Sequence, residues 1–202
     1  MFRYKKSSSG GYYMDWEFTI LNFIRWNWRS DFLDKLMPII SFLGKGGLIW
    51  ILLSVVCLFI KKARPFYRSL VCCLLFNLVA CNCIIKPIVN RIRPCVMNTT
   101  VELLSSVPFD ASFPSGHTLF AFAAATTIFI YNKWYGLAAY LFAFVMGFSR
   151  LYLYVHFPTD VLMGAIFGVI FAIAAYKVEN MLFEKGKPIF RLKARQPKAE
   201  QK

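Results

Sequence analysis

The sequence contains few groups that carry a negative charge or titrate near neutral pH. Its 202 residues include 10 aspartates and glutamates and only two histidines, His117 and His156, against 24 lysines and arginines. The polar motifs around the two histidines contain a single acidic residue, Asp160. Because magnesium is held in proteins mainly by carboxylates, we expect no metal site, and no motif in the chain indicates another cofactor.

The six cysteines do not indicate a redox or zinc site. Five of them lie in apolar stretches, where cysteine packs as a small hydrophobic residue. Cys81 and Cys83 are not spaced like zinc ligands, and no histidine lies near them in the sequence. Cys95 alone lies outside an apolar run. We also find no internal repeat and no cleavable signal peptide, because the first long apolar run begins near Ile39, after a charged segment.

The composition is that of an integral membrane protein. Hydrophobic residues make up 58% of the chain, phenylalanine alone accounts for 21 residues, and the mean hydropathy is +0.51. The net charge of +14 is compatible with nucleic-acid binding, but the basic residues lie between apolar runs and in the C-terminal tail rather than in an exposed polar patch. We therefore expect membrane lipids with anionic headgroups as partners, and no nucleic acid.

The N-terminal part divides into a flexible segment and an amphipathic helix. Residues 1–14 are polar and rich in glycine and serine, which predicts a flexible N-terminus. Over residues 15–29, apolar and aromatic side chains recur at helical spacing, while Asn22, Arg25 and Arg29 share another face. This pattern favours a helix that lies in the headgroup region. The alternative is an ordinary first spanning helix, for which the segment is short and charged.

Five apolar runs follow and predict an all-α, polytopic membrane helix bundle. A helix needs roughly 20 apolar residues to cross the hydrocarbon core, and the runs give five spanning helices, or six if the N-terminal helix also spans. Small residues in the third and fifth runs allow these two helices to pack closely. We expect a membrane-embedded domain over residues 15–180 and a basic cytoplasmic tail over residues 181–202. The runs cover residues 39–60, 69–85, 116–131, 134–149 and 161–178, and the small residues are Ala121, Ala123, Ala124, Ala125, Gly164, Ala165 and Gly168.

The positive charges predict the orientation of the bundle. Basic residues concentrate between the first and second runs, between the third and fourth, and in the tail, and with five spans these regions share one face. The positive-inside rule makes this face cytoplasmic, so the loops before the third and fifth runs face outward. The N-terminal segment is also basic and would begin outside, but a sixth span would return it to the inside. The basic residues of the cytoplasmic regions are Lys61, Lys62, Arg64, Arg68, Lys133, Lys185, Lys187, Arg191, Lys193, Arg195, Lys198 and Lys202.

Two polar motifs at the outward ends of these runs can bind phosphate. The first contains Lys86 and Arg93, which are seven residues apart and share one side of the chain if the turns between them are helical. Both bind phosphate oxygens, arginine through two parallel hydrogen bonds. The second motif, residues 114–117, reads as a turn into a helix whose free N–H groups bind anions. Gly116 allows the backbone to approach closely, and Ser115 offers a hydroxyl.

A third motif, residues 149–160, supplies the remaining groups of a phosphoryl-transfer site. His156 and Asp160 are four residues apart, so the carboxylate can keep one imidazole nitrogen protonated while the other attacks phosphorus. His117, from the second motif, remains as the proton donor to the leaving oxygen. Arg150 adds positive charge where the phosphoryl group becomes negative. Taken singly, Arg150 reads as a snorkelling arginine and Asp160 as a helix-start charge; the meeting of three motifs on one face favours a catalytic site.

Three further polar residues of the outward loops are weaker candidates for the site. We expect Arg91 to be solvated. Glu102 and Asp110 either lie in a solvated loop or contact the headgroup of the substrate, and the sequence leaves this open.

With these motifs the chain resembles the type 2 phosphatidic acid phosphatase superfamily. The family pattern is Lys-x6-Arg-Pro, then Pro-Ser-Gly-His, then Ser-Arg-x5-His-x3-Asp, and the chain matches it without a departure between residues 86 and 160. The resemblance implies a metal-independent lipid phosphatase that works through a phosphohistidine. It also implies that His156 is the nucleophile, Asp160 its partner and His117 the general acid. The matching positions are Lys86, Arg93, Pro94, Pro114, Ser115, Gly116, His117, Ser149, Arg150, His156 and Asp160.

The resemblance leaves several substrates open. The outward loop, residues 95–113, is too short to form a separate domain, and the short chain resembles the bacterial enzymes that dephosphorylate undecaprenyl diphosphate. Phosphatases of phosphatidylglycerol phosphate, phosphatidate and lipid A share the motifs. Vanadate-dependent haloperoxidases share them too, but those enzymes are soluble and do not fit the hydropathy. A function of another class is a membrane transporter or scaffold that reuses the fold, against which the intact His117, His156 and Asp160 argue. Nothing in the sequence indicates an oligomeric state.

Overall fold

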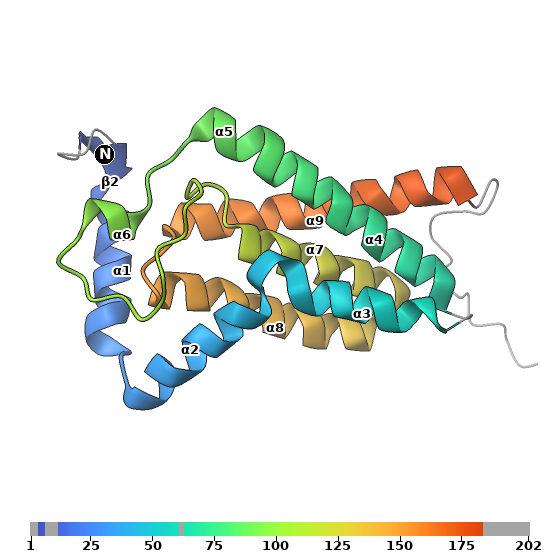
Figure 1. Cartoon of the computed structure of the whole chain (residues 1–202), viewed down its shortest axis with the longest axis horizontal. Coiled ribbons are helices and arrows are strands. Elements are labelled where there is room, and N and C mark those ends of the chain that lie inside the picture. Colours follow the sequence, from blue (N-terminus) through green and yellow to red (C-terminus); the bar gives the residue numbers. More distant parts are fainter. Residues whose placement is uncertain (1–3, 7–11, 61–62, 184–202) are drawn as a thin grey trace, which may run out of the picture.

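The computed structural model describes residues 4–6, 12–60 and 63–183, which form a helical bundle preceded by one short hairpin (Figure 1). The bundle confirms the predicted all-α fold class. The elements are β1 (Tyr4–Lys6), β2 (Tyr12–Met14), α1 (Asp15–Asn27), α2 (Asp31–Leu43), the 3₁₀-helix η1 (Lys45–Gly47), α3 (Leu48–Leu58), α4 (Arg64–Leu78), the π-helix η3 (Val79–Ile85), α5 (Lys86–Val89), α6 (Pro94–Met97), α7 (Gly116–Tyr131), α8 (Lys133–Tyr152) and α9 (Pro158–Phe183).

Three segments of the described residues are long and apolar enough to cross a membrane. They are the segment Pro65–Met97, which runs from α4 through η3 and α5 to the end of α6, then α8, and then α9. A fourth span results if α2 and the η1–α3 segment, which meet at a bend of 44°, are taken together. The sequence predicts five or six spans, and α7 is the apolar helix that falls short, with 16 residues. The structure therefore supports three or four candidate spans, and the higher number stays a prediction.

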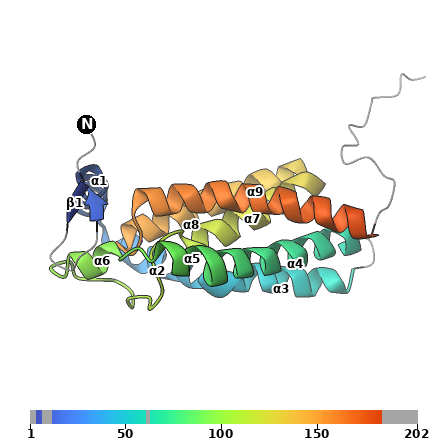
Figure 2. The same ribbon diagram turned by 90° about the horizontal axis from the view of Figure 1, so that it is seen from above.

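The short helix α7 forms the centre of the bundle, where it packs between α8 and α9 and against α4 (Figures 1 and 2). Residues 118–127 are buried without interruption. Two glycines allow α9 to approach the backbone of α7, since a Cβ at Gly168 would lie 2.5 Å from the carbonyl oxygen of Leu119 and one at Gly164 would lie 2.8 Å from that of Ser115. The predicted close packing of the third and fifth apolar runs is thereby confirmed.

The first apolar run is not one straight helix, because glycines break it between α2 and α3. Gly46 and Gly47 have φ values of 59° and 75°, the left-handed region that glycine enters without strain. Gly44 packs so tightly against the core that a Cβ there would lie 2.6 Å from Cε of Met146 and 3.0 Å from Cδ2 of His117. The bend therefore brings the α2–α3 junction against the beginning of α7.

The two ends of the bundle differ in their elements (Figure 1). The end of α3, the beginning of α4, the α7–α8 turn and the end of α9 lie together at one end, as expected for the regions predicted to share a cytoplasmic face. The hairpin, α1, α6 and the beginnings of α7 and α9 lie at the other. In the predicted flexible N-terminus, residues 4–6 and 12–14 pair as antiparallel strands. Its remaining residues lie outside the described residues, as do residues 184–202 of the predicted tail. Residues 181–183, also predicted as tail, belong to α9.

Helix α1 runs across the end of the bundle rather than along it (Figures 1 and 2). Glu17, Leu21 and Ile24 are buried, whereas Phe23 and Trp26 remain 54% and 80% exposed. The structure confirms that this segment is helical, and its amphipathic placement in the headgroup region stays a prediction. Exposed aromatic rings on a helix that lies across the bundle suit the headgroup region of a membrane.

Candidate active site

The three sequence motifs meet at the end of the bundle that carries α1. Lys86 begins α5 directly after the π-helical turn η3, and Arg93 is the extended residue before α6. Residues 114–117 lead into α7. The third motif covers the last turn of α8, the turn at 153–157 and the first turn of α9. Single π-helical turns within α-helices occur frequently at functional sites, which fits the position of η3 immediately before Lys86.

Lys86 and Arg93 form a cationic site, which we call the cradle, and the carboxylate of Asp110 lies between them. Lys86 Nζ pairs with one carboxylate oxygen of Asp110, and Arg93 Nη2 donates to the other at 2.7 Å. The ammonium of Lys86 also lies 3.7 Å from where a Cβ of Gly116 would stand. The structure thus brings together three of the predicted phosphate-binding residues, and the cradle opens onto the beginning of α7.

His156 points one ring nitrogen at the cradle and the other at Asp160. Nε2 lies 3.0 Å from Arg93 Nη1, and since a guanidinium can only donate, Nε2 carries the lone pair. The proton of a neutral ring is then on Nδ1, which lies 3.6 Å from Asp160 Oδ2. This is an ion-pair distance, longer than a hydrogen bond. The lone pair of Nε2 therefore faces Arg93 of the cradle.

Burial controls the charge of His156, which is 1% exposed. It lowers the pKa of His156 well below the usual range, and the opposing effect of Asp160 is weaker than burial together with the charges of Arg93 and Arg150. The imidazole is neutral at physiological pH as a result. A neutral ring is the state in which Nε2 can act as a nucleophile.

Asp160 is fully buried in the first turn of α9 and accepts hydrogen bonds on both carboxylate oxygens. Oδ2 accepts from the hydroxyl of Ser112 at 2.5 Å and from the backbone N–H of Phe157 at 2.8 Å. Oδ1 accepts from Arg91 Nη1 at 2.6 Å. These contacts fix the orientation of the carboxylate towards His156, which suits the predicted role of Asp160 as its partner.

The prediction that Arg91 is solvated is wrong. Its side chain is 17% exposed and pairs with two buried carboxylates, Asp160 at 2.6 Å and Glu17 of α1 at 2.5 Å. It also donates to the hydroxyl of Thr159 at 2.7 Å and stacks over the ring of Phe157 at 4.2 Å. The physical reason is that Glu17 and Asp160, both inaccessible to water, require a shared cation.

The remaining predicted site residues surround the cradle. His117 belongs to the first turn of α7 and packs against Gly44 at the α2–α3 bend. Ser115 is fully buried, its backbone N–H donates to the carbonyl oxygen of Asp160 at 3.0 Å, and its hydroxyl accepts from Thr118 at 3.0 Å. Arg150, 3% exposed, hydrogen bonds through Nη1 to the hydroxyl of Ser41, and its Nε has no partner within the described part of the chain.

Sequence reasoning identifies neither Ser112 nor Glu17, expects Arg91 to be solvated, and leaves Asp110 open between a solvated loop and a headgroup contact. The sequence offers a way to find Asp110 and Ser112, because they lie four and two residues before Pro114 of the second motif. Glu17 lies far from every motif in the sequence, and only the fold brings it to Arg91. Within the described residues, no three His, Cys, Asp or Glu side chains lie close enough together to hold a metal ion.

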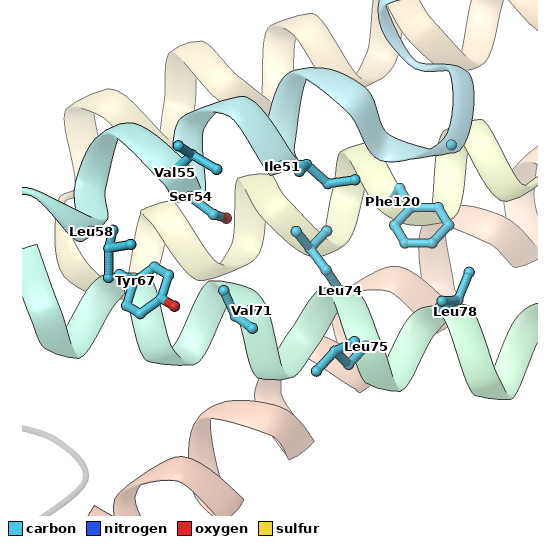
Figure 3. Close-up of a pocket in the computed structure, with 11 residues that line it drawn as sticks. Ile51, Ser54, Val55, Leu58, Tyr67, Val71, Leu74, Leu75, Leu78 and Phe120 are labelled. Carbon is cyan, nitrogen blue, oxygen red and sulfur yellow. The ribbon is translucent and has the colours of Figure 1, made fainter.

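An apolar groove of about 270 Å³ runs between α3 and α4 (Figure 3). One end lies at Leu78 and Phe120, and the other at Leu58 and Tyr67. Gly46 also lines the groove. The bend that contains Gly46 also carries the Gly44–His117 contact described above, so the groove begins next to the candidate site. Its lining is almost entirely aliphatic or aromatic, which suits a hydrocarbon chain.

Comparisons with known proteins agree with this geometry. The family model described as PAP2 superfamily matches residues 66–184. The chain is 28% identical over 149 residues to an undecaprenyl-diphosphatase of Sulfolobus acidocaldarius, covering 73% of this chain and 71% of that protein. It is 31% identical over 154 residues to a lipid A 4'-phosphatase of Bacteroides thetaiotaomicron, covering 69% and 67%. The crystal structure of Aquifex aeolicus LpxE superposes with a TM-score of 0.69 at 30% identity, covering 80% of this chain and 95% of that one.

Proposed function

Because the chain belongs to the PAP2 superfamily of lipid phosphatases, which work without a metal ion, we propose that its substrate is undecaprenyl diphosphate. The products are undecaprenyl phosphate and inorganic phosphate. The observation that supports this substrate is the match to the Sulfolobus undecaprenyl-diphosphatase, which extends over most of both chains.

In the proposed mechanism, Nε2 of His156 attacks the terminal phosphorus, and the bond to the bridging oxygen breaks as the N–P bond forms. His117 donates a proton to that oxygen, which leaves with undecaprenyl phosphate. Asp160 holds the N–H at Nδ1 and balances the positive charge of the phosphorylated ring. Water then attacks the phosphohistidine, His117 takes back a proton, and inorganic phosphate is released. The observation that supports these roles is the Nε2 lone pair of His156, which faces Arg93 at 3.0 Å.

The proposed phosphate site consists of Lys86, Arg93, Ser115, Gly116 and Arg150. Lys86 and Arg93 neutralise the equatorial oxygens of the phosphoryl group, and the buried Arg150 adds a third positive charge. Gly116 leaves space for the phosphate beside Lys86, because its missing side chain would otherwise touch the ammonium group. The hydroxyl of Ser115 keeps its proton free to donate while it accepts from Thr118.

We assign the isoprenoid chain of the substrate to the groove between α3 and α4. Val55 lines the groove, so Val55→Trp should fill part of it and raise the KM for a long-chain lipid diphosphate. It should leave hydrolysis of a short-chain, water-soluble analogue unchanged. Leu52→Trp is the matched control, because Leu52 is 56% exposed on the same helix but does not line the groove. An equal effect of both substitutions on the long-chain substrate would contradict the assignment.

The proposed topology has five spans, with α7 as the fifth, and the site on the extracytoplasmic side of the cell membrane. Its support is the distribution of charge: the beginning of α4, which contains Arg68, and the beginning of α8, which contains Lys133, lie at the end of the bundle opposite the site, and basic regions of this kind remain in the cytoplasm. A central helix enclosed by others need not match the full thickness of the hydrocarbon core, since it does not face lipid along its length.

A lipid A phosphatase is the second candidate, favoured by the identity to the Bacteroides enzyme. Phosphatidylglycerol phosphate and phosphatidate are the further substrates that the motifs allow. The deciding experiment measures phosphate release from all four lipids by the purified protein in EDTA, with His156→Ala as the inactive control. We expect the highest kcat/KM with undecaprenyl diphosphate, and a clear preference for lipid A would replace the first proposal by the second.

A further inference from the structure

The carboxylate of Asp110 lies where the cradle would hold a phosphate. One oxygen pairs with Lys86 and the other accepts from Arg93 Nη2 at 2.7 Å. The backbone carbonyl of Asp110 accepts a further hydrogen bond, from Arg93 Nε at 2.9 Å. Two oxygens carrying one negative charge, bound to an ammonium and a guanidinium, reproduce the contacts that two oxygens of a phosphate would make.

Arg93 cannot bind this carboxylate and a phosphate in the same way at once. Its Nη1 is used by the carbonyl of Val155 at 2.8 Å and by His156. Its Nε and Nη2, the edge that would bind an oxyanion through two parallel bonds, are directed to Asp110, with a longer 3.3 Å contact from Nη2 to the carbonyl of Ala111. A phosphate can bind Nη2 of Arg93 together with Lys86 only when the carboxylate of Asp110 withdraws, whereas Nε donates to the backbone carbonyl of Asp110.

We propose that Asp110 is an exchangeable anion that occupies the cradle in the empty enzyme, gives way to the lipid phosphate, and returns to displace inorganic phosphate after hydrolysis. The proposal rests on the proposed function in one respect, since it assigns the phosphate of the substrate to Lys86 and Arg93. It gives Asp110 a role in setting phosphate affinity and product release, and no part in the chemical step.

Arg93, Lys86 and Asp110 differ in how deeply their side chains are buried, and this difference determines which of them can move. Arg93 is 4% exposed and is held by Val155, and the side chain of Lys86 is 9% exposed. The side chain of Asp110 is 50% exposed and belongs to the loop between α6 and α7. A half-exposed ion pair contributes little to stability, so the carboxylate can leave while the cations stay in position.

Asp110 remains charged throughout this exchange. Burial by itself would raise the pKa of the carboxyl group, but the neighbouring Lys86 and Arg93 outweigh burial and lower the pKa of Asp110 well below its usual range. The group is therefore an anion at any pH at which the enzyme works. It reduces the net positive charge that would otherwise retain the released phosphate among Lys86, Arg93 and Arg150.

The test is the affinity of the full-length protein, purified in detergent, for inorganic phosphate. If the cradle is closed by Asp110 about nine-tenths of the time, its removal should tighten the apparent Kd roughly tenfold, because the competent fraction rises to one. Asp110→Asn and Asp110→Ala should both show this tightening in titration calorimetry, and the inhibition constants of phosphate and orthovanadate should fall by the same factor. Asp110→Asn keeps the shape of the side chain, so it still tests the proposal if Asp110→Ala is unstable.

Glu102→Gln is the matched control, since it removes one negative charge from an exposed position of the same loop. We expect it to leave the Kd of phosphate unchanged. Unchanged or weaker phosphate binding by Asp110→Asn would overturn the proposal and indicate that Asp110 holds Lys86 and Arg93 in place. Equal tightening in Glu102→Gln would also overturn it, as an effect of general charge. The titration uses no lipid, so failure to hydrolyse undecaprenyl diphosphate would refute only the proposed substrate.

Discussion

Arg91 and Asp160 are joined by a 2.6 Å hydrogen bond from Nη1 to Oδ1, while the other terminal nitrogen of Arg91 binds Glu17 of α1 at 2.5 Å. Asp160 directs its second oxygen towards His156, so Arg91 connects the helix that lies across the bundle to the partner of the proposed nucleophile. Neither Arg91 nor Glu17 occupies a defining position of the three motifs, and we regard Arg91 as a positioning residue.

Substitution of Arg91 should therefore reduce turnover more than substrate binding. For Arg91→Met we expect kcat to fall roughly 10–100-fold with little change in KM, as when the outer partner of a functional histidine is removed. Arg91→Lys keeps the charge but cannot bridge two carboxylates, and should recover part of the loss. Steady-state kinetics on purified variants measures this, with Lys35→Met at an exposed position of α2 as control. If Arg91→Met lowered thermal stability but left kcat unchanged, the role of Arg91 would be structural and the prediction would be wrong.

The proposed nucleophile can be identified directly. His156→Ala should abolish phosphate release while the protein still inserts and folds, and rapid acid-free quenching of the wild type with a labelled substrate should trap phosphate on His156. Phosphate trapped on any other residue would refute the assignment.

The proposed general acid can be tested with two kinds of substrate. His117→Ala should lower kcat roughly 10²–10⁴-fold on a lipid diphosphate, the usual effect of removing a general acid. The loss should be much smaller with an activated aryl phosphate, whose leaving group needs no proton. Equal losses on both substrates would argue against the acid role of His117.

The position of the motifs was predictable from the sequence, whereas the contacts that complete the site were not. Lys86, Arg93, His117, His156 and Asp160 stand out because they are charged or titratable groups at the ends of apolar runs, where such groups are costly unless used. The partners of these groups are distant in sequence: Lys86 meets Asp110 across 24 residues and Arg91 meets Asp160 across 69. Only the packing of the helices decides which loop residue reaches which cation.

Helix boundaries show the same limit. The small residues of the third and fifth runs correctly predict close packing, because a helix without side chains at Gly164 and Gly168 has one face open to a neighbour. Gly44, Gly46 and Gly47 can also be read from the sequence, but a hydropathy pattern does not distinguish a continuous helix from a helix that bends at these glycines. Their effect depends on the contacts of Gly44 with His117 and Met146, which are tertiary.

The pH dependence follows from the lowered pKa of His156. A histidine with an ordinary pKa near 6.5 would lose its lone pair as the pH falls through that value, whereas His156, with its pKa depressed by burial, stays neutral well below it. We therefore expect no acid-side fall in kcat/KM near pH 6.5 that comes from the enzyme. Any break there should move with the phosphate pKa of the substrate when two lipid phosphates are compared. A fall that stays at pH 6.5 for both would contradict a buried, neutral His156.

The proposed orientation places the α6–α7 loop outside the cell and the α7–α8 turn in the cytoplasm. Cys95 is unsuitable as a reporter, although it is the one cysteine outside the apolar runs, because it is 5% exposed. In a variant without native cysteines, Ser106→Cys in the exposed part of the loop should react with a membrane-impermeant thiol reagent in intact cells. Lys133→Cys in the exposed α7–α8 turn should react only after the membrane is permeabilised. The positive-inside rule gives this expectation, since Lys133 belongs to the basic face. The reverse pattern of labelling would place hydrolysis in the cytoplasm and would also require the N-terminal helix to lie on that side.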